Sequence, residues 1–256
     1  MKRIIAVLAL AALVAGCGPS KKKVLLAGQK KQFGATKLAE GKAEDALADL
    51  TEAHKLDPKD PEIAHLLGMA YWSKARLVGD ESMKLDAEKY VLLSFKLKKK
   101  DVPGDWHNNL GALYVDMKRY PDAIKELELA IKDPEYRTPE RPNNNIAEAY
   151  LMQGDYAKAK EYADKALRIQ PRFCMALTNR GKACEGLKQY EEALKAQKDA
   201  IAECPEYPEP YLHAGLMDLK LGKLADARTH WTTAKKLDPD GKVGKEAEQY
   251  LRTLGH

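Results

Sequence analysis

Apolar residues recur along this chain at intervals of three or four positions, in blocks of about 34 residues that begin near residue 27. In one block, for example, the spacing runs along a single face through Tyr156, Ala159, Ala163 and Leu167. A spacing of three or four residues is typical of an amphipathic α-helix. Most blocks end at a proline, which cannot continue a helix, so the pattern predicts helical hairpins in series.

Small residues mark the same two places in successive blocks. The eighth position of a block is where the two helices of a hairpin would cross, and only a small side chain fits there. The residues at this position are Gly34, Gly68, Gly111, Ala147, Gly181 and Gly215. The residues at the twentieth position are Ala46, Ala87, Ala123, Ala159, Ala193 and Ala227. Prolines close four of the blocks at Pro58, Pro171, Pro205 and Pro239.

This pattern resembles the tetratricopeptide repeat, a hairpin of two helices with a period of 34 residues. The resemblance implies an all-α fold, a superhelical solenoid of six repeats. We expect these repeats over 27–60, 61–103, 104–139, 140–173, 174–207 and 208–241. The second repeat has extra residues, most of which we expect in a longer hairpin turn between Leu77 and Leu85. Residues 242–256 should form a C-terminal capping helix whose outer face is solvated.

The first twenty residues have the features of an export signal. A basic start precedes an apolar run over 4–15, which is well short of the roughly 20 residues needed to span a bilayer. The sequence VAGC at 14–17 resembles the bacterial lipobox. The resemblance implies that residues 1–16 are a lipoprotein signal peptide and that Cys17 carries lipid after cleavage. An ordinary cleaved signal with a chance cysteine is the alternative.

Lipid on Cys17 would convert a water-soluble chain into a tethered one. Gly18 follows it, instead of the aspartate that resembles an inner-membrane retention signal, which favours the periplasmic face of the outer membrane. Residues 17–26 are then expected to be a lipidated N-terminus and linker. Three consecutive lysines at 21–23 either rest on anionic headgroups or belong to a merely solvated linker.

Three more cysteines follow in what would be an oxidising compartment. Cys174 begins the first helix of its repeat and Cys204 ends the second, and an antiparallel hairpin brings those two ends together. We therefore predict a disulfide between Cys174 and Cys204. Cys184 lies in the middle of a helix and is expected to be a buried free thiol. Three reduced thiols are the alternative.

Composition agrees with thin helical layers more than with a large enzyme core. Charged residues make up 32% of the 256 positions and aromatic residues 7%, with only three phenylalanines, so there is much surface to solvate and no thick centre to fill. The net charge of +5 is spread along the chain, unlike the concentrated basic stripe of a nucleic-acid-binding protein. We expect no nucleic-acid partner.

No constellation for catalysis, metal binding or cofactor binding is found in the sequence. The chain has no HExxH pair and no phosphate-binding glycine loop. Its six histidines are scattered, at His54, His65, His107, His213, His230 and His256. We therefore expect a binding protein and not an enzyme, with no cofactor.

A binding site is expected on the concave wall that first helices form in such repeats. In the first two repeats Leu38, Met69 and Trp72 make this wall unusually apolar, which implies an apolar partner. Burial of Trp72 against the preceding repeat is the alternative.

Asparagines recur on the same wall in later repeats. They are Asn108, Asn109, Asn144, Asn145 and Asn179. A side-chain amide both donates to and accepts from a peptide backbone, so this ladder is expected to hold a bound peptide. Hydrogen bonds between neighbouring repeats are the alternative.

The lipobox, the six repeats, the length and the possible disulfide together resemble the type IV pilus pilotins, the PilF, PilW and Tgl family. The resemblance implies a monomeric, periplasm-facing lipoprotein of the outer membrane that binds a secretin subunit in its groove. Its role would be to localise the secretin and assist its assembly, and so to support pilus-driven motility. Two alternatives stay open: a scaffold for outer-membrane protein assembly or polysaccharide export, and an activator of a peptidoglycan synthase.

Overall fold

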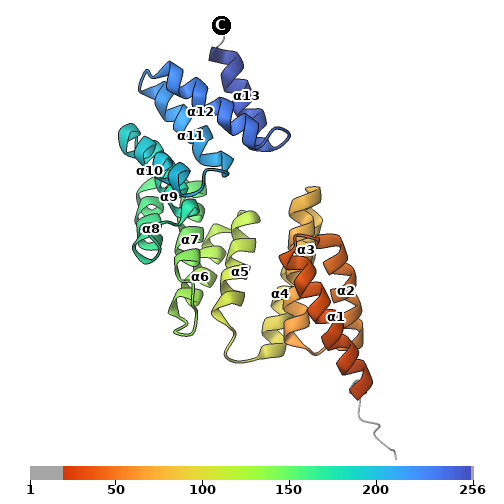
Figure 1. Ribbon diagram of the computed structural model, residues 1–256. Coiled ribbons are helices and arrows are strands. Elements are labelled where there is room, and N and C mark those ends of the chain that lie inside the picture. Colours follow the sequence, from red (N-terminus) through yellow and green to blue (C-terminus); the bar gives the residue numbers. More distant parts are fainter. Residues whose placement is uncertain (1–19, 255–256) are drawn as a thin grey trace, which may run out of the picture. The chain divides into compact units, whose positions relative to one another are not determined.

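The computed structural model describes residues 20–254, which form thirteen α-helices and no strand (Figure 1). The all-α prediction is confirmed. The helices are α1 (Lys21–Ala39), α2 (Ala43–Leu56), α3 (Pro61–Val78), α4 (Glu81–Lys98), α5 (Gly104–Asp116), α6 (Tyr120–Lys132), α7 (Glu140–Gln153), α8 (Tyr156–Ile169), α9 (Cys174–Gly186), α10 (Tyr190–Glu203), α11 (Pro208–Lys220), α12 (Leu224–Leu237) and α13 (Lys242–Leu254). The predicted signal peptide and Cys17 lie outside the described residues. None of the described helices combines the length and apolarity that a membrane crossing requires.

The chain divides into two compact units, which are described separately. Unit 1 runs to Leu97 and consists of α1 to α4. Unit 2 begins at Lys98 and holds α5 to α13.

The core of unit 1 is built where paired helices approach closely. Ala46 and Leu50 of α2 are buried against Leu67 and Ala70 of α3. Gly68 of α3 faces α4 so closely that an added Cβ would lie 2.9 Å from the carbonyl oxygen of Ala87. The small residue predicted at the eighth repeat position is therefore required by backbone contact.

The hairpin of the second repeat differs from the prediction of a long turn between Leu77 and Leu85. Its extra residues lengthen the helices, since α3 and α4 have 18 residues each and only Gly79 and Asp80 separate them. Gly79 has a φ of 72°, a left-handed conformation that glycine adopts without strain. The Asp80 carboxylate accepts a hydrogen bond from the backbone N–H of Ser82 at 2.9 Å, which stabilises the start of α4. These two residues make a complete turn, so no longer loop is needed.

The first helix also begins earlier than expected. Residues 21–26 were predicted to belong to a linker, but α1 starts at Lys21. The side chain of Ser20 accepts a hydrogen bond from the backbone N–H of Lys23 and caps the helix. The residues that follow are without proline or a turn signal, so the helix runs unbroken into the first repeat.

Unit 2 contains four helical hairpins and a final helix. Its paired helices have 13 or 14 residues each, and small residues again lie at the crossings. Gly111 faces the side chain of Leu127, and Gly215 faces Trp231. Helix α13 lies where a final helix was expected. Val243, Ala247 and Leu251 on one of its faces pack against the core around Trp231.

Burial of His65 makes the stability of unit 1 dependent on pH. His65 in α3 is 4% exposed, and desolvation lowers its pKa to about 3, against about 6.5 in an unfolded chain. Between these two values the unfolded chain binds a proton that the folded chain does not bind. The contribution of His65 to the free energy of unfolding of unit 1 is thus fully present above pH 6.5. It is lost as the pH falls below this value, by up to about 1.4 kcal/mol for each pH unit.

Urea unfolding at pH 7 and pH 5 tests this prediction. Between these pH values the free energy of unfolding of unit 1 should fall by about 2 kcal/mol more in the wild-type protein than in a His65→Gln variant, because the glutamine does not titrate. Carboxylates contribute equally to both proteins and cancel in the comparison. Equal decreases in the two proteins would show that folding does not lower the pKa of His65.

Candidate protein-binding groove

A groove of about 600 Å³ lies in unit 1, on the side of the hairpins where a binding wall was expected. We call it the unit 1 groove. Its lining comes from the end of α1, the start of α2 and the second half of α3. The lining residues are Leu38, Gly41, Ala43, Leu66, Met69, Trp72, Ser73, Arg76 and Leu77. All three apolar residues named from the sequence are therefore brought together around one cavity.

Helical spacing explains how α3 supplies most of this surface. Leu66, Met69, Ser73 and Arg76 follow one another at intervals of three or four residues, so their side chains share a face of α3. On the other side, α1 ends beside Gly41, which has a φ of 75°. This left-handed turn lets α2 start within the groove lining.

The residues of the groove differ in exposure. Leu38 and Leu66 are partly buried and pack against the core of unit 1, so they form a fixed floor. Trp72 is half-buried, with the guanidinium carbon of Arg76 5.8 Å from its ring centroid. Leu77 is 74% exposed at the rim. Trp72 is thus neither packed away completely nor fully solvated.

The groove carries a single charged group among its described lining residues, the guanidinium of Arg76. The neighbouring Lys74 is engaged elsewhere, in an ion pair of 2.7 Å with Glu44. An apolar surface with one cation at its rim is suited to an apolar segment that carries a carboxylate. Arg76, Leu66 and Leu77 were missed in the sequence. A spacing of three from Met69 and of four from Trp72 would have identified Leu66 and Arg76, whereas Leu77 lies outside this spacing.

The asparagines of unit 2 form hydrogen bonds between neighbouring repeats. The side-chain Nδ2 of Asn145 donates to Oδ1 of Asn108 at 3.1 Å, and Nδ2 of Asn179 donates to Oδ1 of Asn144 at 2.9 Å. These bonds join α5 to α7 and α7 to α9. Asn108, Asn144 and Asn179 are buried. These amides therefore bridge neighbouring repeats, the alternative that the sequence left open, and the peptide-binding role of the ladder stays a prediction.

These bridges form because burying an amide without a hydrogen-bond partner costs free energy. The asparagines at the fifth and sixth positions of adjacent repeats satisfy each other, so their amide groups are already used. Asn109 and Asn145 are only half-buried. Peptide contact at Asn109 stays a prediction.

Removal of one bridging amide should destabilise unit 2. Asn144→Ala leaves the buried amide of Asn179 without its acceptor, at an expected cost of about 1 to 3 kcal/mol in the free energy of unfolding. A double-mutant cycle with Asn179→Ala, measured by urea unfolding, isolates the bond. The double variant should lose less stability than the sum of the single variants. Strictly additive losses would contradict a direct bond between the two side chains.

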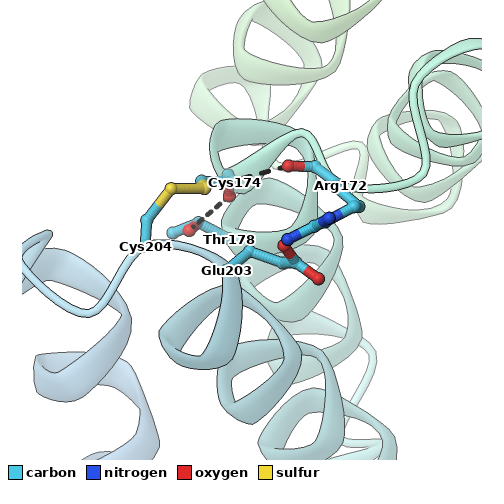
Figure 2. The surroundings of a disulfide bond; sticks show 5 residues. All are labelled: Arg172, Cys174, Thr178, Glu203 and Cys204. Atoms are coloured by element: carbon cyan, nitrogen blue, oxygen red, sulfur yellow. Dashed lines mark hydrogen bonds and ion pairs between the residues drawn. A yellow bond between two sulfur atoms is a disulfide. The ribbon is translucent and has the colours of Figure 1, made fainter.

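The structure joins Cys174 and Cys204 in a disulfide, with the two Cα atoms 6.3 Å apart (Figure 2). Cys174 lies at the start of α9 and Cys204 directly follows α10, so the bond closes the open end of one hairpin. The hydroxyl of Thr178 donates to the carbonyl oxygen of Cys174 at 2.9 Å, and an ion pair links Arg172 to Glu203 at the same end. Cys184 is a buried free thiol, and burial raises its pKa.

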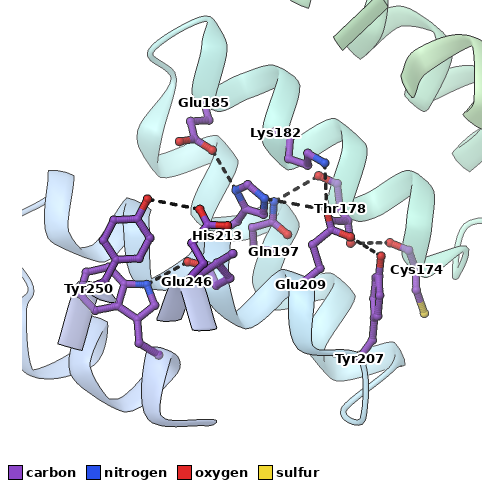
Figure 3. A network of polar contacts seen from close by, with 12 residues as sticks. Cys174, Thr178, Lys182, Glu185, Gln197, Tyr207, Glu209, His213, Glu246 and Tyr250 are labelled. Carbon is purple, nitrogen blue, oxygen red and sulfur yellow. Dashed lines mark hydrogen bonds and ion pairs between the residues drawn. The ribbon is translucent and has the colours of Figure 1, made fainter. Parts of the chain in front are cut away.

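A polar network fastens α9 to α11 (Figure 3). The Nζ of Lys182 lies 2.9 Å from Oε1 of Glu209, whose other oxygen accepts a hydrogen bond from the hydroxyl of Tyr207. Burial alone would raise the pKa of Glu209, but the charge of Lys182 and the hydrogen bonds from Tyr207 and Lys182 together outweigh it, and the pKa is lowered. Nδ1 of His213 lies 3.2 Å from Oε2 of Glu185. This network was not predicted from the sequence. The opposite charges on the first helices of adjacent repeats could have indicated it.

Two overlapping segments, residues 104–172 and 144–208, match profiles described as tetratricopeptide repeat. The solved structure of a tetratricopeptide repeat protein from Parabacteroides merdae has the same fold, with 15% identity and a TM-score of 0.69 over 90% of this chain and 84% of that one. The fold is the tetratricopeptide repeat fold. Tetratricopeptide repeats typically act as scaffolds for protein interaction, so the unit 1 groove is best described as a candidate site for a protein partner.

Two solved structures of tetratricopeptide repeat proteins match over almost their whole length. The Pseudomonas aeruginosa PilF structure is 18% identical with a TM-score of 0.69, and the match covers 91% of this chain and 100% of that one. PilW, described as a widely conserved type IV pilus biogenesis factor, is 19% identical with a TM-score of 0.73, and the match covers 88% and 98% of the two chains. At these identities the likeness shows a shared fold.

Larger proteins contain related repeats. Heat shock protein STI1 of Saccharomyces cerevisiae is 30% identical over 116 residues, which cover 42% of this chain and 20% of that protein. Tetratricopeptide repeat protein 28 of Homo sapiens is 30% identical over 86 residues, 34% of this chain and 4% of that protein. The chain thus matches a fifth or less of the length of these curated relatives.

Proposed function

We propose that this protein is a lipid-anchored, periplasm-facing protein of the outer membrane that assists localisation and assembly of the type IV pilus secretin. The unit 1 groove receives an apolar segment of a secretin subunit. The observation that carries the proposal is the groove itself, an open and largely apolar surface, on a chain whose sequence predicts an export signal. The full-length likeness to the folds of PilF and PilW supports the choice of system.

The groove explains how such a segment would be held. Anchoring one aliphatic side chain between Met69 and Trp72 removes apolar surface from water, which contributes about 1.5 to 3 kcal/mol for a fully buried leucine or valine. A carboxylate on the same segment pairs with Arg76, and this pairing sets the direction in which the segment lies. An aggregation-prone secretin subunit would be kept apart from wrong partners while it is bound.

A lipid anchor at Cys17 places this groove beside the membrane in which a secretin ring assembles. The anchor is tested by mass spectrometry of the N-terminal peptide of the membrane-extracted protein. We expect a peptide that begins at Cys17 and carries acyl chains. A peptide that begins elsewhere, or a Cys17 without acyl mass, would remove the anchor from the proposal.

Deletion of the gene tests the proposed role directly. Without the protein, secretin subunits should remain monomeric on heated gels, and pili and pilus-driven motility should be lost. Complementation with the intact gene should restore the multimers. Normal heat-stable multimers in the deletion strain would overturn the proposal and favour another envelope role.

Two matched surface substitutions connect this role to the groove. Leu77→Glu places a charge at the groove rim, whereas Leu224→Glu changes an exposed leucine of α12 in unit 2. The two leucines are 74% and 53% exposed, so neither change should affect folding. Leu77→Glu is expected to weaken secretin binding at least about tenfold, the cost of about 1.4 kcal/mol for one lost apolar contact, while Leu224→Glu binds normally. Equal binding by both variants would place the site outside the groove.

A further inference from the structure

The start of α1 is exposed on every side, in contrast to the rest of that helix. Each of residues 21–26 is exposed, whereas Ala27 is 1% exposed and begins the packed part of the helix. The exposed turns nevertheless carry large apolar side chains. Val24 is 45% exposed, Leu25 67% and Leu26 39%. Apolar groups at the end of a helix, with no packing to explain them, indicate a surface that meets something else.

The apolar side chains continue along one face of the helix. With about 100° between successive residues of an α-helix, Leu25, Phe33 and Leu26 fall within an arc of about 100°. Phe33 is 58% exposed and lies about 12 Å further along the helix axis than Leu25. The buried residues of α1, Ala27 and Gly34, lie on the opposite face. The exposed face therefore presents three large apolar side chains over two turns and more, with the polar side chains of Lys22 and Gln29 among them, while the opposite face packs on unit 1.

The lysines of α1 fall into two groups. Those in the packed part form ion pairs: Lys30 with Asp49 and Glu52, Lys31 with Asp60 and Glu62, and Lys37 with Asp49. The ammonium groups of the lysines at 21–23 form no ion pair within residues 20–254. The positive charge that the fold leaves uncompensated on α1 is thus concentrated at its first turn, beside the exposed apolar groups.

The position of this turn in the chain restricts what can cover it. Only three residues lie between Cys17 and Lys21, so the two Cα atoms are at most about 14 Å apart in a fully extended chain. Acyl chains on Cys17 would therefore hold the start of α1 at the bilayer surface. Apolar side chains beside uncompensated lysines are the composition that binds at the boundary between anionic headgroups and acyl chains.

We propose that the first turns of α1 lie on the membrane surface, with Leu25, Leu26 and Phe33 inserted at the headgroup boundary and the lysines at 21–23 against anionic phospholipid. The inference rests on the lipid anchor of the proposed function and is independent of the secretin. Unit 1, which holds the groove, is then oriented relative to the bilayer by its own first helix.

A spin label tests this contact in the intact lipoprotein. Cys174 and Cys204 are bridged, Cys184 is buried, and Cys17 is acylated under the proposed function, so a cysteine introduced by Leu25→Cys is the accessible thiol for labelling. The labelled protein is reconstituted in vesicles of phosphatidylethanolamine and phosphatidylglycerol. Collisions of the label with oxygen, which concentrates in lipid, are compared with collisions with a water-soluble nickel chelate. Leu224→Cys in unit 2 is the matched control.

The label at Leu25 should show an oxygen-to-nickel collision ratio severalfold above that at Leu224. Replacing the three lysines at 21–23 with glutamine should lower the Leu25 ratio, as should vesicles without phosphatidylglycerol. Equal ratios at the two positions would overturn the inference and would mean that the face is solvated or is covered by a protein absent from the vesicles. The N-terminal acyl mass of the same sample is measured first. The acyl mass shows whether Cys17 carries lipid, and the collision ratio shows whether α1 contacts the membrane, so the two proposals are tested separately.

Discussion

Replacing both Cys174 and Cys204 with serine is expected to lower the free energy of unfolding of unit 2 by about 3 to 4 kcal/mol. The bond has a sequence separation of 30, so it removes much of the conformational freedom of the unfolded α9–α10 segment. The Cα distance of 6.3 Å lies within the range of ordinary disulfides. Both cysteines are half-buried, so serine fits at either position without burying an unpaired hydroxyl.

Urea unfolding with and without a reducing agent measures this contribution. Reductant should lower the unfolding midpoint of the wild-type protein to that of the double-serine variant and should leave the variant unchanged. Mass spectrometry of unreduced peptides should find Cys174 linked to Cys204. A free Cys174 thiol in protein extracted from the cell envelope, with equal midpoints for the two proteins, would contradict the bridge.

Trp231→Ala should lower the free energy of unfolding by about 3 to 5 kcal/mol and detach the final helix. Trp231 of α12 is completely buried, and its Nε1–H donates to the carbonyl oxygen of Leu212 at 3.1 Å. Its ring stacks on Tyr250 of α13, with the centroids 5.0 Å apart. The alanine variant loses this packing, leaves a cavity beside Gly215 and removes the surface on which α13 rests.

Hydrogen exchange locates the effect of this substitution. Amides of α13 should exchange much faster in Trp231→Ala, whereas those of unit 1 should be unchanged, because contacts in such repeats are between neighbours. Trp231→Phe keeps a large ring and should show a smaller change in both stability and exchange. If α13 stays protected in the alanine variant, Trp231 is not what holds the final helix, and its capping role would need another explanation.

The sequence predicted the helices well because each repeat is stabilised locally. Crossing positions such as Gly68 and Gly215 must be small to allow two helices to approach, and this requirement recurs at a fixed spacing. The same periodicity placed Cys174 and Cys204 at neighbouring helix ends. It also located Leu38, Met69 and Trp72 around one groove, because first helices of adjacent repeats are neighbours.

Features that depend on single contacts were not predictable from the period. The residues around Gly79 were expected to form a longer turn, but a two-residue turn sufficed and the helices took up the insertion. Ser20 caps a helix that begins at Lys21, six residues before the first repeat, and the repeat pattern does not extend to these residues. The pairing of Asn144 with Asn179 depends on which side-chain atoms meet, and the sequence left both interpretations open.

Photo-crosslinking from the groove in living cells is the most direct test of the central claim, that the unit 1 groove holds a secretin segment. A photoreactive amino acid replaces Leu77 at the groove rim, and the same residue replaces Leu224 in unit 2 as the control. We predict an adduct at Leu77 that contains the secretin subunit and no such adduct at Leu224. A secretin adduct from Leu224 alone, or none from Leu77 in cells that assemble secretin normally, would contradict the claim.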